Sequence, residues 1–95
     1  MKTIGIRAAL KKIGATDIEV RTGHLDKSGF FNLPGRGLMY FSFSRPMHCR
    51  GAVMVRTAQS RKDYRGGTNE WWFDEKLAEL GYRVNLGELR SLNRG

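Results

Sequence analysis

The fold is decided by residues 37–58, which read GLMYFSFSRPMHCRGAVMVRTA. Apolar and polar side chains alternate through residues 37–44 and again through residues 52–58, and this period of two is typical of a half-buried β-strand. The side chains expected to face the core are Met39, Phe41, Phe43, Val53 and Val55. Because only a short turn punctuated by Pro46 and Gly51 separates the two strands, they are predicted to pair as an antiparallel hairpin.

Two helices are expected, one on each side of this hairpin in the sequence. In residues 3–13 the apolar side chains recur at helical spacing, and Gly14 follows where a helix commonly ends. Residues 70–80 have a similar pattern, with Asn69 as the expected N-cap and Gly81 after the last turn. The buried side of the second helix is expected to comprise Trp72, Phe73, Leu77 and Leu80.

Four further segments complete the prediction. Alternating side chains indicate a strand over residues 17–22 and a short final strand over residues 82–86. Residues 23–36, which contain three glycines and a proline, are interpreted as a long connection. Residues 59–69 are polar and end in Gly-Gly-Thr-Asn, so they are interpreted as an exposed loop. The predicted order is α-β-β-β-α, with or without the last β, in one domain that spans residues 1–95.

These elements predict an α+β fold. Its antiparallel sheet has three strands, or four if the last strand joins it, and both helices lie on one face. The opposite face of the sheet is then expected to be open to solvent. The side chains expected on this open face are Glu19, Arg21, Tyr40, Ser42, Met54 and Arg56.

The composition excludes several classes of protein. Hydrophobic residues make up 40% of the 95 residues and charged residues 27%, which is typical of a small globular domain. No apolar run approaches the roughly 20 residues that span a bilayer, and the N-terminus has no apolar signal segment. Cys49 is the single cysteine, so no internal disulfide can form. We therefore expect a cytoplasmic protein with no membrane partner.

The positive charge of the chain is concentrated in its middle. The formal net charge is +8, from 17 Lys and Arg against 9 Asp and Glu. Residues 27–65 hold eight bases and one acid, a net +7, whereas residues 66–95 are slightly acidic at −1. Because such asymmetry costs self-repulsion in a folded domain, it indicates an anionic partner, which is DNA or RNA in the first hypothesis. The alternative is a basic surface that is merely solvated.

The predicted function is that of a non-enzymatic nucleic-acid-binding protein that contacts the phosphate backbone through its central hairpin and the loop that follows. Guanidinium groups bind phosphates in a bidentate way, and an aromatic ring among them can stack on bases. The predicted nucleic-acid-binding residues are Arg21, Tyr40, Arg45, Arg50, Arg56, Arg61, Lys62, Tyr64 and Arg65.

The second hypothesis is an interaction protein of phage or mobile-element type that docks its basic face on the acidic surface of a host protein and inhibits it. Trp71 and Trp72 are adjacent and cannot both face the core of a helix. Trp71 is the expected partner anchor in this case, because exposed tryptophans often dominate binding energy at interfaces. The alternative for Trp71 is that it covers the end of the sheet.

Catalytic and metal chemistry have little support in the sequence. His24, His48 and Cys49 are the only imidazole and thiol groups, and they lack the spacing of a zinc site or of a nucleophile with its base. No phosphate-binding or dinucleotide-binding glycine motif is present. We therefore predict no catalytic residue, no metal and no cofactor.

One resemblance leads to a third hypothesis. Leu10-Lys-Lys-Ile-Gly14 followed by Val20-Arg-Thr-Gly-His24 resembles the start of the HicA-type toxin endoribonucleases, which begin with a helix, a glycine, a strand and Gly-Ser-His. The resemblance implies an αβββα fold of the double-stranded-RNA-binding type and a ribonuclease in which His24 is catalytic. It spans residues 10–24, and both the serine before the histidine and the aromatic residue after Gly14 are absent here.

Overall fold

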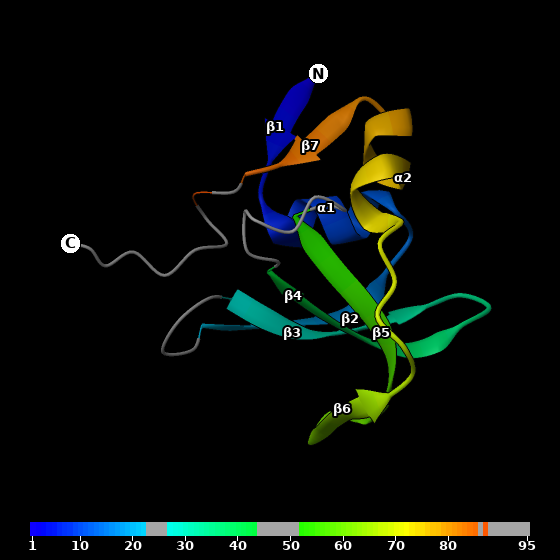
Figure 1. Cartoon of the computed structure of the whole chain (residues 1–95). Coiled ribbons are helices and arrows are strands. Elements are labelled where there is room, and N and C mark those ends of the chain that lie inside the picture. The colour runs from blue at the N-terminus through cyan, green and yellow to red at the C-terminus, as the bar shows by residue number, and fades with distance from the viewer. Residues whose placement is uncertain (23–26, 44–51, 86, 88–95) are drawn as a thin grey trace.

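The computed structural model describes residues 1–22, 27–43, 52–85 and 87. Within these ranges the protein is α+β, with two helices, a five-stranded antiparallel sheet and a separate pair of strands (Figure 1). In chain order the elements are β1 (Lys2–Ile4), α1 (Ile6–Lys12), β2 (Thr16–Thr22), β3 (Lys27–Leu33), β4 (Gly37–Phe43), β5 (Val53–Ser60), β6 (Asp63–Gly66), α2 (Phe73–Glu79) and β7 (Tyr82–Val84). Neither helix in this part of the chain has the length and apolar content needed to cross a membrane.

The predicted hairpin is confirmed as the centre of the main sheet. Strands β4 and β5 pair in antiparallel fashion, with Phe41 opposite Val55 and Phe43 opposite Val53. The turn expected at residues 45–51 lies outside the described residues. The sheet order is β2-β3-β4-β5-β6, so every strand pairs with its neighbour in the sequence. The α+β class is therefore as predicted, but the three or four strands expected for the sheet are too few.

Both helices cover one face of this sheet (Figure 1), and their apolar sides form a single core with it. The fully buried side chains of the core include Ile6, Leu10, Phe31, Met39, Phe41, Val53, Val55, Phe73 and Leu77. The helix α2 is also fixed to the start of β5, because the Asp74 carboxylate accepts hydrogen bonds from the amides of Ala52 and Val53 at 3.0 and 3.1 Å. Leu80 follows the last helical residue and is 48% exposed, so its predicted place in the core is wrong.

Each helix begins later than predicted because other pairings use the preceding backbone. Residues Lys2–Ile4 form β1, which pairs in parallel with β7, and α1 therefore begins at Ile6. Before α2, the amide and carbonyl of Glu70 pair with those of Val55 at 2.7 and 3.1 Å, which keeps residue 70 out of the helix. The N-cap of α2 is Trp72 rather than Asn69.

Strand β3 lies in the segment that was expected to be a long connection. Gly29 favoured a turn in the sequence, yet it lies within the strand opposite Val20 and Phe41. A Cβ atom at this position would be 1.9 Å from the carbonyl oxygen of Glu19, so a close approach of β2 requires the glycine. The prediction of a connection was wrong because the glycine permits close packing here rather than a turn.

Two further strands differ from the prediction. The polar segment 59–69 contains the end of β5 and the whole of β6, which pair with each other as Ser60 opposite Asp63 and Ala58 opposite Gly66. The short final strand expected over residues 82–86 is present as β7 over Tyr82–Val84, but it pairs with β1 instead of joining the main sheet. Neither β6 nor β1 has an alternating apolar pattern, so the backbone pairing that defines them has no clear signal in the sequence.

Replacing a core residue should lower the free energy of unfolding far more than replacing Leu80, which was wrongly predicted to lie in the core. Phe31→Ala removes a fully buried ring between β3 and the helices, and we expect it to lower the free energy of unfolding by roughly 3–5 kcal/mol. Leu80→Ala removes a half-exposed side chain, and we expect a loss below about 1 kcal/mol. Urea unfolding measures both, and equal losses would contradict the core described here.

Candidate nucleic-acid interface

The β5–β6 ribbon, defined here as residues 57–66, folds back over the face of the sheet that the helices leave uncovered. Figure 1 shows β6 on the side of the sheet opposite α1 and α2. On this outer face Glu19, Phe30, Tyr40 and Arg56 are successive register partners across β2, β3, β4 and β5. The outer face is therefore partly covered, and the prediction that it is open to solvent is wrong.

Three aromatic rings form a column on the outer face, and the last of them belongs to the ribbon. The rings of Phe30 and Tyr40 are 5.3 Å apart between centroids, and Tyr64 of β6 stacks on Tyr40 at 4.9 Å with an angle of 28°. The guanidinium carbon of Arg21 lies 4.7 Å from the centroid of Phe30. Phe30 is 2% exposed, whereas Tyr64 is 50% exposed. This aromatic column (Phe30, Tyr40 and Tyr64) thus runs from a buried ring to one that reaches solvent.

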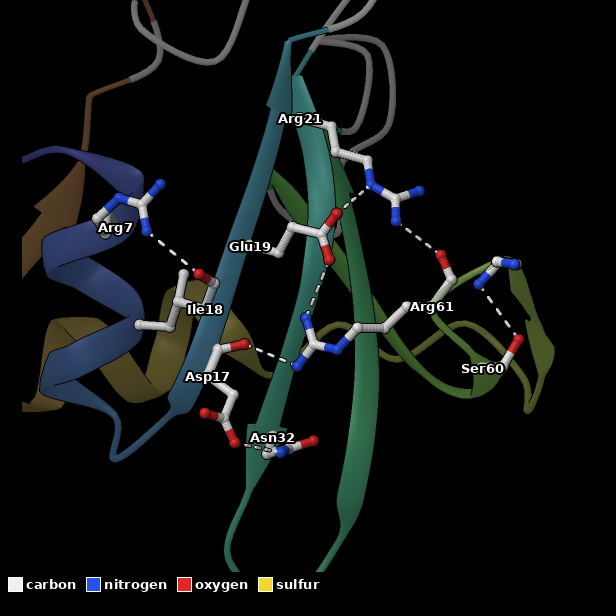
Figure 2. A network of polar contacts seen from close by, with 9 residues as sticks. Arg7, Asp17, Ile18, Glu19, Arg21, Asn32, Ser60 and Arg61 are labelled. Atoms are coloured by element: carbon white, nitrogen blue, oxygen red, sulfur yellow. Dashed lines mark hydrogen bonds and ion pairs between the residues drawn. The ribbon is translucent and has the colours of Figure 1, made fainter.

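A carboxylate on β2 holds the turn of the ribbon in place. Glu19 accepts hydrogen bonds from the Nε of Arg21 at 2.6 Å and from the Nη1 of Arg61 at 3.1 Å (Figure 2). The Nη2 of Arg21 in turn donates to the carbonyl of Arg61 at 2.7 Å. Because Arg61 lies in the turn between β5 and β6, this group of three side chains, called the Glu19 clamp below, joins β2 to the ribbon.

A bulge in β2 provides one more acceptor for the clamp. The register of β2 against β3 shifts between Thr16 and Glu19, and Asp17 has a φ of 50° in the left-handed region. The Nη2 of Arg61 donates to the carbonyl of Asp17 at 2.8 Å, and the Nδ2 of Asn32 donates to the Asp17 carboxylate at 2.8 Å (Figure 2). The strained residue is therefore held by side chains from the ribbon and from β3.

Several arginines predicted to bind nucleic acid make contacts within the protein. Arg56 is partly buried and donates to the Asn69 side chain and the Gly67 carbonyl, so it holds the segment after β6. Its Nε is buried and has no hydrogen-bond partner in the described part of the chain. Together with the clamp residues Arg21 and Arg61, Arg56 thus stabilises the outer face, and Tyr40 lies between two other rings.

Three predicted residues near the end of the ribbon are exposed to solvent. Lys62 is exposed, and its ammonium group forms no ion pair with any residue in the described ranges. Arg65 is paired with Asp63 at 2.9 Å, but its side chain is 76% exposed. With the half-exposed Tyr64 they form what we call the ribbon tip (Lys62, Tyr64 and Arg65).

Other predicted residues lie elsewhere or outside the description. Trp71 is half-buried just before α2, and its neighbour Trp72 packs against the core. Arg45, Arg50, His24, His48 and Cys49 all lie outside the described residues. Across the residues that are described, no three His, Cys, Asp or Glu side chains are grouped so that they could hold a metal ion.

The sequence reasoning missed two groups of charged residues. Glu70 accepts two hydrogen bonds from Arg36, at 2.7 and 3.1 Å, and one from the indole of Trp72 at 2.7 Å. Residues 1–16 contain four bases and no acid. Three of these bases, Arg7, Lys11 and Lys12, are exposed on α1, and the absence of acids before Asp17 was a signal that could have identified this second basic surface.

The hydrogen bonds that Glu19, Asp63 and Glu70 accept favour the charged form of their carboxylates. The pKa of Glu19 lies below its ordinary value because Arg21, and then Arg61, donate hydrogen bonds to its carboxylate. The pKa of Glu70 is lowered mainly by Arg36. The pKa of Asp63 is lowered mainly by the side chain of Arg65. At neutral pH all three carboxylates are therefore charged and bound to arginines or an indole.

Comparison of the chain with family models, curated proteins and solved structures gives no significant match. The function is therefore inferred from the residues of this chain.

Removal of the Glu19 charge should loosen the ribbon without unfolding the domain. In Glu19→Gln the neutral amide has one acceptor oxygen in place of two, so it cannot form ion pairs with both arginines as the carboxylate does. We expect faster hydrogen exchange at residues 61–66 and little change at β4, measured by exchange with mass spectrometry. Glu75→Gln is the matched control because it makes the same change on an exposed residue of α2, away from the ribbon. Equal exchange in both variants and the wild type would contradict the role of the clamp.

Stability should depend on pH in the acidic range. A carboxylate whose pKa is lowered on folding contributes stability that is complete above its ordinary pKa, 4.5 for Glu19 and Glu70, and is lost as pH falls through the lower folded value. We therefore expect the urea midpoint to fall as pH decreases below about 4.5. The double variant Glu19→Gln with Glu70→Gln should lose part of this dependence, and an unchanged pH profile would contradict it.

Proposed function

We propose that this protein is a non-enzymatic nucleic-acid-binding protein that holds the phosphate backbone at its ribbon tip. The observation that carries the proposal is the exposure of Lys62, Tyr64 and Arg65 on the ribbon, on the side of the sheet opposite the helices. Lysine and arginine side chains are the usual partners of phosphate, and contacts through them position a protein without reading sequence.

The ion pair that Arg65 makes within β6 does not prevent this contact. A pair at the surface contributes only about 0–1 kcal/mol, because both charges stay hydrated and screened. A backbone phosphate offers the same guanidinium group two acceptor oxygens and one negative charge, as the carboxylate does, so one pair of the same kind replaces another. A nucleic acid can thus replace Asp63 as the partner of Arg65 at little cost, whereas Arg56 would have to leave a partly buried site to do so.

Charge in the rest of the molecule supports the same ligand. Residues 27–65 carry a net +7, and the overall charge is +8, so the field attracts polyanions before contact. Arg45 and Arg50, which precede β5, belong to this charge and remain part of the proposal. The proposal includes no catalytic step, metal or cofactor.

A charge reversal at the tip tests the proposal. We expect Lys62→Glu to weaken binding to DNA or RNA by about tenfold near physiological salt and to make the salt dependence less steep by about one unit of slope. Lys76→Glu on α2 is the matched control, because it makes the same charge change on an exposed residue away from the ribbon. Fluorescence anisotropy over a salt series measures both.

Two outcomes would contradict this function. Absence of binding to DNA and RNA at low salt would exclude it. Equal weakening by the Lys62 and Lys76 variants would show that net charge alone, and not the ribbon tip, determines the affinity. Retention of one protein partner after nuclease treatment would instead favour docking on an acidic protein surface, with the half-buried Trp71 as a candidate anchor.

A further inference from the structure

We propose that the ligand of the ribbon tip is single-stranded nucleic acid, and that one unpaired base stacks on the outward face of the Tyr64 ring. This inference rests on the proposed function and specifies the class of nucleic acid. It follows from the position of Tyr64 at the open end of the aromatic column.

One face of the Tyr64 ring is covered by another ring, and the residue as a whole still reaches solvent. Tyr40 stacks on Tyr64 with a centroid distance of 4.9 Å and an interplanar angle of 28°, so it covers one face. The residue is nevertheless 50% exposed. The proposal places the base on the ring face turned away from Tyr40, where it would extend the column of Phe30, Tyr40 and Tyr64 by one ring.

The ring is also held in position before any ligand arrives. Tyr40 is itself supported by Phe30 at 5.3 Å, and Phe30 is buried beneath the Arg21 guanidinium. The Glu19 clamp fixes the turn just before β6 through Arg61. A ring that is fixed in this way loses little conformational freedom on binding, so stacking adds directly to affinity.

The geometry favours a single strand over a duplex. In a duplex each base is stacked on both faces and paired at its edge, so a base must first be unstacked before a protein ring can contact its face. An unpaired base has no such cost, and stacking on an aromatic ring tolerates every base. Lys62 and Arg65 are both exposed within two residues of Tyr64, so their charges are available to the phosphates of a bound strand. Arg65 follows Tyr64 in β6 and therefore points to the other face of that strand.

The covered outer face limits the site to one base. Phe30 is buried and Tyr40 is enclosed between two rings, so neither offers a free face. A single stacking position with two phosphate contacts reads no sequence. We therefore expect similar affinity for single strands of different sequence, and for DNA and RNA of the same sequence.

The test compares short single strands of DNA and RNA with the duplex of the same sequence, using fluorescence anisotropy and the full chain. We expect the wild type to bind either single strand about tenfold more tightly than the duplex. Tyr64→Leu should remove this preference by weakening only the single-strand complexes, and Tyr64→Phe should retain it. Urea unfolding of both variants checks that the outer face remains folded.

A second measurement uses the unchanged protein, in case Tyr64→Leu disturbs the column. A single strand that carries 5-iodouracil should crosslink to Tyr64 on irradiation, as mapped by mass spectrometry. Equal affinity for single strand and duplex in the wild type, or crosslinks at other residues with none at Tyr64, would overturn the inference and leave the proposed function intact. Absence of binding to all of these nucleic acids would overturn both.

Discussion

The outer face of this protein depends on one carboxylate that joins residues far apart in the sequence. Glu19 lies on β2, an edge strand of the five-stranded sheet, and Arg61 lies in the turn that leads to β6, the other edge strand. Their contact requires the last part of the sheet to curl back across the intervening strands (Figure 2). The bulge at Asp17 adds a carbonyl acceptor at the same place. Phe30 and Tyr40 are covered because this curl is maintained.

How much of the fold is predictable depends on how each strand is buried. The hairpin of β4 and β5 has one buried face, so its sequence alternates and its pairing was predicted correctly. In β3 both Phe30 and Phe31 are buried, on opposite faces of the sheet, so the alternation is lost. An acidic residue such as Glu70, just before an apolar helical pattern, is typical of the first turn of a helix. In the structure its backbone is instead paired with that of Val55. This backbone pairing joins two separate segments of the chain and leaves no local signal in the sequence.

The candidate site was predictable in its residue types but not in its geometry. The composition of segment 59–69 correctly indicated exposure for Lys62 and Arg65. No pattern indicated that Arg61 would pair with a glutamate 42 residues earlier in the chain. A count of basic residues thus overstates the number of free cations, because folding uses arginines as cross-links between strands. The positive field remains, but moderate salt screens it over about 10 Å. Direct contact with an anionic ligand therefore depends on a few exposed side chains.

The pairing of β1 with β7 has a consequence for the order of folding. All strands of the main sheet pair with their sequence neighbours, so the sheet can assemble progressively as the chain is synthesised. Strand β1 is different, because Thr3 lies opposite Arg83 and accepts a hydrogen bond from it across 80 positions of sequence. Closing so long a loop is slow. During translation β1 must therefore wait, unpaired, until β7 leaves the ribosome, so a strand that is made before the main sheet is ordered after it.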